Sequence, residues 1–304
     1  GILMADLKVS VAGVEFHNPL IAASGTFGFG REYAEFYPLS ALGGISSKGI
    51  TLKARPGNPA PRIAEAPGGM LNAVGLQNPG VDHFIEKDLP WLREQGVTII
   101  ANIAGNTPED YCAMAEKLND TDIDMIEMNI SCPNVKCGGM AFGTQPKMVE
   151  EVVSAAKAKA KKPLIVKLSP NVTDIAEIAR AAESAGADAL SLINTLLGMR
   201  IDIEKRRPIL SNVMGGLSGP AVRPIALRMV WQAVGAVNIP VVGLGGIATG
   251  RDALEFIMAG ATAVQVGAAN FANPRAMETI AEEMAAWMDA HGVKTLDEIR
   301  GCAR

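Results

Sequence analysis

Cysteine and net charge are both scarce in this 304-residue chain, and each scarcity excludes a class of protein. Four cysteines are too few for a disulfide scaffold of this length, so we interpret them as cytoplasmic thiols. The 28 Lys and Arg residues nearly balance the 32 Asp and Glu residues, and a net charge of −4 argues against nucleic-acid binding and a basic membrane patch. A hydrophobic content of 48% excludes a disordered chain and indicates a large core.

Long apolar runs are absent as well. No uninterrupted run reaches the roughly 18 residues of a transmembrane helix. The N-terminus also lacks the basic-then-apolar order of a signal peptide. We interpret Gly1–Leu3, which precede Met4, as an expression remnant and exclude them from fold reasoning. The sequence thus predicts a cytoplasmic protein.

Short apolar runs alternate with amphipathic stretches, which is the order of an α/β fold with a parallel sheet. Leu164–Val166 and Ile239–Val242 are apolar at consecutive positions, as strands covered on both faces require. The expected strands are Pro19–Ser24, Gly43–Lys48, Thr98–Ala104, Met125–Ser131, Leu164–Ser169, Ala189–Asn194, Val241–Gly246 and Ala263–Gly267. The expected helices are Pro108–Asn119, Pro146–Ala160, Asp174–Ala185, Pro220–Val234, Arg251–Ala259 and Pro274–His291.

Eight strands, each followed by a helix, make up a closed (β/α)8 TIM barrel. No composition shift or linker marks a second domain, so we expect residues 1–304 to form one barrel domain. A doubly wound open sheet is the alternative, because it has the same order of elements.

Two segments lie outside this repeat. Leu7–Val11 and Val14–Phe16 flank Ala12-Gly13 and predict an N-terminal β-hairpin that covers the lower end of the barrel. Thr51–Asn72 extends the loop after the second strand and is rich in proline and glycine. Because long loops without secondary structure are usually functional, we expect this one to form a wall or lid over the mouth.

Polar residues collect at the carboxyl ends of the predicted strands, where a barrel of this kind carries its active site. They are Lys48, Lys167, Asn102, Asn129, Asn134, Asn194 and Cys132. An amide offers both donors and an acceptor, so the asparagines match the edge of a flat heterocycle with C=O and N–H groups. These ends carry no carboxylate, which argues against a hydrolytic metal site and two-carboxylate acid–base chemistry.

The glycines near the seventh strand indicate a phosphate site. Gly243–Ala248 matches the dinucleotide pattern, but no acidic residue follows at the end of the next strand. The bare backbone of Gly245-Gly246 and Gly267-Ala268, with Gly219-Pro220 opening a helix, fits the phosphate of a mononucleotide better than NAD.

Lys167 and Cys132 each admit more than one interpretation. Lys167 is a Schiff-base lysine, a fixed cation beside a cofactor, or a rim residue that reaches solvent, and Lys48 faces the same choice. Cys132 is either a small buried hydrophobic residue or a thiolate base. The cysteine spacing excludes a zinc or iron–sulfur site, and none of the three histidines lies at a strand end to form a Cys–His pair.

The loop Asn129–Lys136 (NISCPNVK) resembles the active-base loop of class 1 dihydroorotate dehydrogenases. Further similar motifs are Asn72–Pro79 (NAVGLQNP), Val166–Asn171 (VKLSPN), Ile193–Thr195 (INT) and Gly215–Pro220 (GGLSGP). The resemblance covers the chain from about Leu7 onward, and Cys137–Gly139 with Gly25–Tyr37 resemble the B type.

This resemblance implies a catalytic subunit that oxidises dihydroorotate to orotate in pyrimidine biosynthesis, with one FMN per chain. It also implies a partner subunit that carries FAD and a [2Fe–2S] cluster and passes electrons to NAD⁺. The expected assembly is a homodimer core within a heterotetramer. No metal site is expected on this chain.

The resemblance also implies residue roles. Cys132 would remove the C5 proton while C6 gives a hydride to FMN, Lys48 would lie between flavin and substrate, and Lys167 would stabilise the reduced flavin. Substrate would contact Lys48, Asn72, Ala73, Val74, Gly75, Leu76, Asn129, Asn134, Asn194 and Thr195. FMN would contact Ser24, Lys48, Gly49, Asn102, Asn129, Lys167, Ile193, Gly219, Gly245, Gly246, Gly267 and Ala268.

Three alternatives stay open at this point. An A-type enzyme would use fumarate directly as its electron acceptor. A dihydropyrimidine dehydrogenase would act on dihydrouracil, although that family usually has iron–sulfur segments that this sequence lacks. A non-enzymatic binding module is the third alternative.

Overall fold

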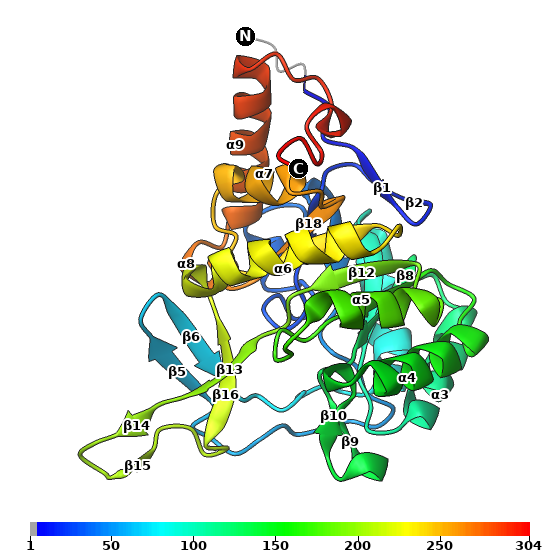
Figure 1. Ribbon diagram of the computed structural model, residues 1–304, viewed down its shortest axis with the longest axis vertical. Helices are drawn as coiled ribbons and strands as arrows, with labels where there is room; N and C mark the ends of the chain where they lie inside the picture. The colour runs from blue at the N-terminus through cyan, green and yellow to red at the C-terminus, as the bar shows by residue number, and fades with distance from the viewer. Residues whose placement is uncertain (1–4) are drawn as a thin grey trace.

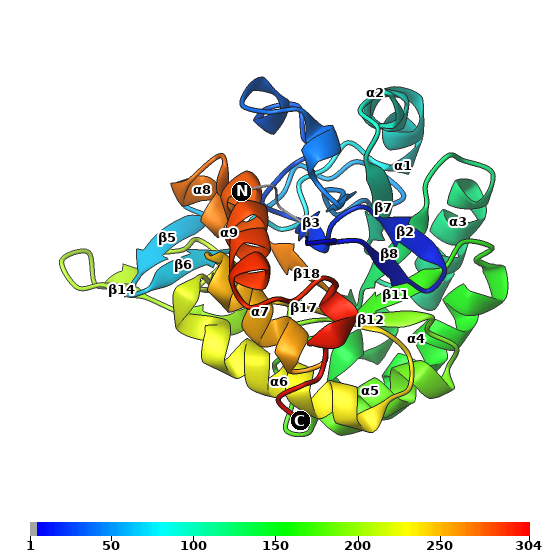
Figure 2. The same cartoon turned by 90° about the horizontal axis from the view of Figure 1, so that it is seen from above.

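The computed structural model describes residues 5–304, except for the side chains of residues 133–135. Eight parallel strands form a closed barrel, because β18 pairs with β3 as well as with β17 (Figures 1 and 2). They are β3 (Leu20–Ala22), β4 (Gly44–Ser46), β7 (Thr98–Ile103), β8 (Met125–Asn129), β11 (Leu164–Lys167), β12 (Ala189–Leu192), β17 (Val241–Leu244) and β18 (Ala263–Val266). The expected (β/α)8 fold is confirmed, and the open sheet is wrong.

Helices cover the outside of the barrel and begin close to their predicted starts. The Thr107 and Thr249 side chains accept from the N–H groups of Asp110 and Asp252, which bond back to the caps. The helices are α3 (Pro108–Asn119), α4 (Pro146–Lys159), α5 (Ile175–Ser184), α6 (Arg223–Ala236), α7 (Gly250–Met258), α8 (Ala269–Ala272) and α9 (Ala276–Ala290). Short 3₁₀ turns are η4 (Val135–Cys137), η5 (Phe142–Thr144), η6 (Pro220–Val222) and η7 (Leu296–Glu298). Over residues 5–304, no helix combines the length and apolar character needed to cross a bilayer.

Two parts of the chain depart from the predicted repeat. Only the 3₁₀ turns η1 (Tyr33–Glu35) and η2 (Leu39–Ala41) join β3 to β4, because glycines with positive φ and Pro38 interrupt this segment. Conversely, residues 81–94 form a helical segment that was not predicted. It consists of α1 (Val81–His83), the π turn η3 (Phe84–Asp88) and α2 (Leu89–Glu94). Pro90, which has no N–H to donate, obscures its helical pattern.

The N-terminal hairpin is confirmed. Strands β1 (Val9–Val11) and β2 (Val14–Phe16) pair antiparallel, with Val9 opposite Phe16. The Phe16 ring lies against Gly44, where an added Cβ would come within 2.7 Å of it. Because Gly44 is the first residue of β4, the hairpin covers the amino-terminal end of the barrel, as expected.

The expected long loop is wrong in one respect: its second half is a β-hairpin. Strands β5 (Ile63–Ala66) and β6 (Gly69–Asn72) join β16 (Met214–Ser218) and β13 (Leu196–Met199) in an antiparallel sheet of order β13-β16-β6-β5. Leu71, Ala64 and Leu210 form a small core beneath it. β5 and β6 follow barrel strand β4, and β13 and β16 follow barrel strand β12, so this sheet forms a wall at the carboxyl end of the barrel.

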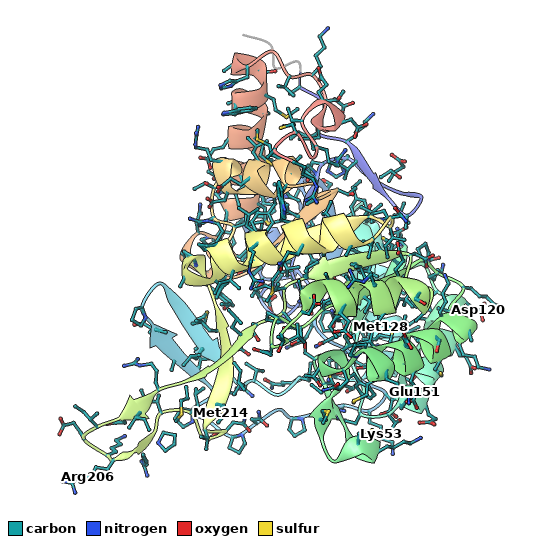
Figure 3. The ribbon with its side chains drawn as sticks, viewed as in Figure 1. Lys53, Asp120, Met128, Glu151, Arg206 and Met214 are labelled. Carbon is teal, nitrogen blue, oxygen red and sulfur yellow. The ribbon has the colours of Figure 1, made fainter. Side chains whose placement is uncertain are left out.

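An arm continues from this wall. It consists of β14 (Ile201–Asp202) and β15 (Arg207–Pro208), and Figure 3 shows Arg206 at its tip, far from the barrel. A further small hairpin, β9 (Pro133–Asn134) with β10 (Met140–Ala141), follows β8 at the same end of the barrel. Neither hairpin was predicted, because two-residue strands carry no periodic signal.

Candidate active site

Three neighbouring strands bring predicted residues together at the mouth. Lys167, the last residue of β11, lies opposite Asn129, the last residue of β8. Asn194, just beyond β12, donates from Nδ2 to Asn129 Oδ1 over 3.1 Å. The side chain of Asn194 also accepts from the Thr195 N–H over 2.8 Å. The predicted substrate amides Asn129 and Asn194 therefore form one hydrogen-bonded pair.

Cys132 lies three residues after Asn129, in the loop that follows β8, and is 5% exposed. Its loop is fixed on both sides: the Phe142 N–H donates to the Cys132 carbonyl over 3.0 Å, and the Tyr111 hydroxyl donates to the Asn129 carbonyl over 2.6 Å. Burial raises the pKa of the Cys132 thiol, whereas the Tyr111 hydroxyl and the charge of Arg55 act in the opposite direction. The cysteine is buried, yet it has a phenol and a guanidinium as neighbours.

The other cysteines lie elsewhere. Cys112 is half-buried on α3, and Cys137 and Cys302 are exposed. Over residues 5–304, no group of three His, Cys, Asp or Glu side chains is arranged to hold a metal ion.

The segment Asn72–Leu76 reaches other residues of the predicted site. Asn72 lies opposite Gly216 in the wall, and Gly216 is packed against the Thr195 side chain. At the other end, the Leu76 side chain approaches Gly49, where an added Cβ would lie 2.9 Å from Leu76 Cδ2 and 3.5 Å from Asn102 Oδ1. The structure thus joins the predicted substrate loop to both sides of the mouth.

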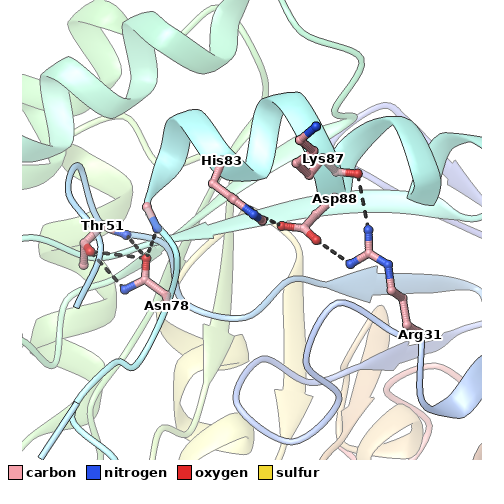
Figure 4. A network of polar contacts seen from close by, with 7 residues as sticks. Arg31, Thr51, Asn78, His83, Lys87 and Asp88 are labelled. Carbon is pink, nitrogen blue, oxygen red and sulfur yellow. Dashed lines mark hydrogen bonds and ion pairs between the residues drawn. The ribbon is translucent and has the colours of Figure 1, made fainter. Parts of the chain in front are cut away.

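Buried Asn78 holds this loop in place (Figure 4). Asn78 Nδ2 donates to the Leu76 carbonyl over 2.7 Å and to Thr51 Oγ1 over 2.9 Å. Asn78 Oδ1 accepts from the N–H groups of Thr51 and Gly80 over 3.1 and 2.9 Å. Leu76 has a φ of +57°, a region that leucine rarely adopts, and the bond from Asn78 stabilises it there. Figure 4 also shows buried Asp88, which ties Arg31 to the helical segment through its carboxylate.

The glycines predicted to bind phosphate form two groups. An added Cβ on Gly246 would lie 2.6 Å from the Gly219 carbonyl, and one on Gly245 would lie 3.3 Å from Ile193 Cγ1. Gly267 approaches Thr26 beyond β3, and Ala268 precedes α8. A cavity lined by Thr26, Phe27, Gly28, Asn270 and Phe271, among others, opens beside the second group.

Two predicted residues, Ser24 and Lys48, are less closely connected to the others. Ser24 and Lys48 are half-buried at strand ends, and the Lys48 N–H donates to the Gly28 carbonyl over 3.1 Å. The side chain of Asn134 lies outside the described residues.

One site residue was missed. Glu127 lies two residues before Asn129 on β8, is completely buried, and accepts hydrogen bonds from four side chains. Burial raises its pKa, but the Lys167 charge and these donors outweigh burial and hold the pKa of Glu127 below its usual value. Burial also disfavours the charged form of Lys167 and so lowers its pKa, whereas the charge of Glu127 acts to raise it. The two-residue alternation of a strand, which places Glu127 and Asn129 on one face, was the available signal.

The fold and these contacts define a (β/α)8-barrel protein with a polar site at the carboxyl ends of its strands. The family model for dihydroorotate dehydrogenase matches residues 6–288. The chain therefore belongs to the dihydroorotate dehydrogenase family, as the motifs predicted.

Individual relatives agree with this assignment. The chain is 61% identical over 296 residues to the dihydroorotate dehydrogenase B (NAD⁺) catalytic subunit of Alkaliphilus metalliredigens, covering 97% of this chain and 98% of that protein. It is 56% identical to the proteins of that name from Petrotoga mobilis and Bacteroides thetaiotaomicron, covering 98% of this chain and 99% of each relative. The resemblance to the B type is confirmed.

The Asn78 clamp leads to a first prediction. Replacing Asn78 by Ala leaves the buried Thr51 and Gly80 N–H groups and the Leu76 carbonyl without this partner, so the free energy of unfolding should fall by about 1–3 kcal/mol. Urea unfolding measures the loss. Asn212→Ala removes an exposed asparagine that makes one bond, to Met214, and should change stability by less than about 0.5 kcal/mol. Equal effects of the two substitutions would contradict the clamp.

Proposed function

We propose that this chain oxidises dihydroorotate to orotate, with Cys132 as the base and a bound FMN as the hydride acceptor. Family membership supports the reaction. The observation that carries the assignment of the site is the hydrogen-bonded pair Asn129–Asn194. Asn129 of this pair lies three residues before Cys132 and opposite Lys167. A planar pyrimidine with amide edges matches two side-chain amides.

The residues at the mouth fit a flavin. Asn102 Oδ1 and Gln265 Oε1 are buried and have no hydrogen-bond partner among the described residues, so both are free to accept from donor groups of a bound flavin. Lys167 offers a cation for the electron-rich edge, and the glycine groups at 245–246 and 267 offer backbone N–H groups for the phosphate. When bound, FMN supplies a hydride acceptor for C6 of the substrate.

The chain's own residues account for the proton. Cys132 would take the C5 proton, which is acidic only because the neighbouring C4 carbonyl accepts the developing charge. Donors from Asn129 and Asn194 at that oxygen would stabilise this charge. The backbone of Asn72–Leu76, fixed by Asn78, would hold the substrate carboxylate, and Lys48 would lie between substrate and flavin.

The route of the electrons requires a second protein. The relatives are named catalytic subunits of NAD⁺-dependent enzymes, which supports a separate partner subunit and does not favour the fumarate-dependent or dihydrouracil alternatives. The proposed partner carries FAD and a [2Fe–2S] cluster, and two copies of this chain form the core of a heterotetramer.

A substitution of Cys132 tests the assignment of the base. Cys132→Ala should retain FMN, while the anaerobic reduction of FMN by dihydroorotate slows about 10²–10⁴-fold, because a positioned base is lost. Stopped-flow absorbance measures the bleaching of the flavin. Cys112→Ala, on the outer helix α3, should reduce FMN at the wild-type rate. Loss of flavin from Cys132→Ala with a normal rate in the fraction that keeps it would refute the proposal.

The pKa of Cys132 predicts a pH dependence. Because burial raises this pKa, the thiolate fraction is small at neutral pH, and the single-turnover rate should rise with pH from neutral into the alkaline range. Tyr111→Phe removes the hydroxyl whose influence lowers the pKa of Cys132, so its profile should move to higher pH. A profile that stays flat from pH 6 to 10 in both proteins would exclude a titrating thiol.

The acceptor is tested by comparing NAD⁺ and fumarate. The purified chain alone should reduce NAD⁺ poorly, and adding the co-purified flavoprotein subunit should restore NAD⁺ reduction. Rapid turnover with fumarate by the chain alone would instead assign it to the A type.

A further inference from the structure

One layer of the barrel interior is entirely polar. Ser46, Glu127, Ser191 and Gln265 come from β4, β8, β12 and β18, which are alternate strands of the ring. All four are at most 1% exposed. Layers of four side chains from alternate strands normally consist of bulky apolar residues. A polar layer immediately below the mouth therefore calls for a functional explanation.

Glu127 is the centre of this layer. Its Oε1 accepts from Ser46 Oγ over 2.7 Å and from Asn102 Nδ2 over 2.8 Å. Its Oε2 accepts from Ser191 Oγ and Gln265 Nε2, each over 2.8 Å. Since β18 lies opposite β8 in the ring, the Gln265 side chain reaches Glu127 across the barrel interior. Both carboxylate oxygens are thus fully used.

These bonds fix the direction of two amides. An ionised carboxylate only accepts hydrogen bonds, so Asn102 and Gln265 must present their NH₂ groups to Glu127. Their carbonyl oxygens are left over, and both are buried without a partner among the described residues. Two acceptors are thereby reserved for a ligand that brings its own donor.

The four donors are neutral, so they do not balance the charge of Glu127. Lys167 of the neighbouring strand β11 lies opposite Asn129, two residues beyond Glu127, is 6% exposed, and is the charged group that acts on the Glu127 carboxylate. The remaining groups around the carboxylate are the hydroxyls and amides of β4, β7, β12 and β18. A buried charge without a partner costs several kcal/mol, so each of these two ions depends on the other.

We propose that Glu127 is a positioning residue of the flavin site, which keeps Lys167 charged and leaves the oxygens of Asn102 and Gln265 free to accept from the flavin. This inference rests on the proposed FMN site. It adds Glu127 and Gln265, neither of which belongs to the residues implied by the family resemblance.

The sign of a change in reduction potential distinguishes this role from simple charge repulsion. A charged Lys167 stabilises reduced, negatively charged flavin and raises the potential. If Lys167 loses its proton when Glu127 is neutralised, the potential falls, as it does when Lys167 itself is removed. If Lys167 stayed charged without Glu127, loss of a nearby negative charge would raise the potential instead.

The first experiment measures the FMN midpoint potential at neutral pH in the wild type, Glu127→Gln, Lys167→Gln and the double variant. We expect both single substitutions to lower the potential and the double variant to go no lower than Lys167→Gln. Asp188→Asn removes a carboxylate that pairs with Lys157 at the opposite end of the barrel and should leave the potential unchanged. A raised or unchanged potential in Glu127→Gln, or additive effects in the double variant, would overturn the proposal.

Glu127→Gln also tests the amide directions. A glutamine has an NH₂ group where the carboxylate has its second acceptor oxygen. The amide that faces this NH₂ group, Asn102 or Gln265, must therefore turn its oxygen towards it and present its own NH₂ to the flavin. The FMN dissociation constant, measured by the fluorescence of released FMN, should rise at least tenfold. An unchanged dissociation constant would show that the amides do not contact the flavin.

A second experiment avoids FMN and leaves Glu127 in place. In Lys167→Gln apoprotein, Glu127 loses its counter-charge and its pKa in the folded state rises above the unfolded value. The variant is then most stable at low pH, where Glu127 is protonated, and it loses stability as pH rises and Glu127 ionises. The loss in its free energy of unfolding relative to wild type should therefore grow from pH 5 to pH 8. A loss that is independent of pH would refute the pairing. If wild-type protein binds no FMN, the proposed function fails, whereas this measurement still decides whether the two ions are coupled.

Discussion

A carboxylate inside the barrel is the constraint on which the site depends. Glu127 is withdrawn from water, and an isolated charge there would be prohibitively costly. Four hydrogen-bond donors and the Lys167 ammonium group stabilise it, and these five groups come from five different barrel strands. The closed ring is what lets these strands reach one point. This arrangement fixes the directions of the Asn102 and Gln265 amides and the position of the Lys167 ammonium group below the mouth.

The wall over the mouth depends on a smaller set of bonds. Asn78 joins Thr51 to Leu76 and holds a leucine backbone in the left-handed region. Beside it, the antiparallel sheet pairs β6 with β16, two segments that follow different barrel strands. The proposed binding of a substrate through the backbone of this loop requires rigidity, because each N–H has to keep its direction. The clamp and the sheet supply that rigidity.

Cys132 is placed between opposing influences. Burial disfavours the thiolate, while Tyr111 and Arg55 favour it. The phenol comes from α3 and the guanidinium from the segment after β4, so both neighbours depend on the packing of distant elements. In the proposed role of base, a thiol close to groups that stabilise its anion suits abstraction of a weakly acidic proton.

The sequence by itself determined the barrel strands, most helix starts and the polar strand ends, because these features have local causes. Consecutive apolar residues identify Leu164–Lys167, and the cap Thr107 marks the start of α3. Only the tertiary structure decided the wall and the polar layer. Strand β6 pairs with a strand about 145 residues away, and Gln265 reaches Glu127 across 138 residues of sequence. Hydrogen bonds between residues far apart in the chain leave no periodic pattern in the sequence, so they can be identified only in the folded structure.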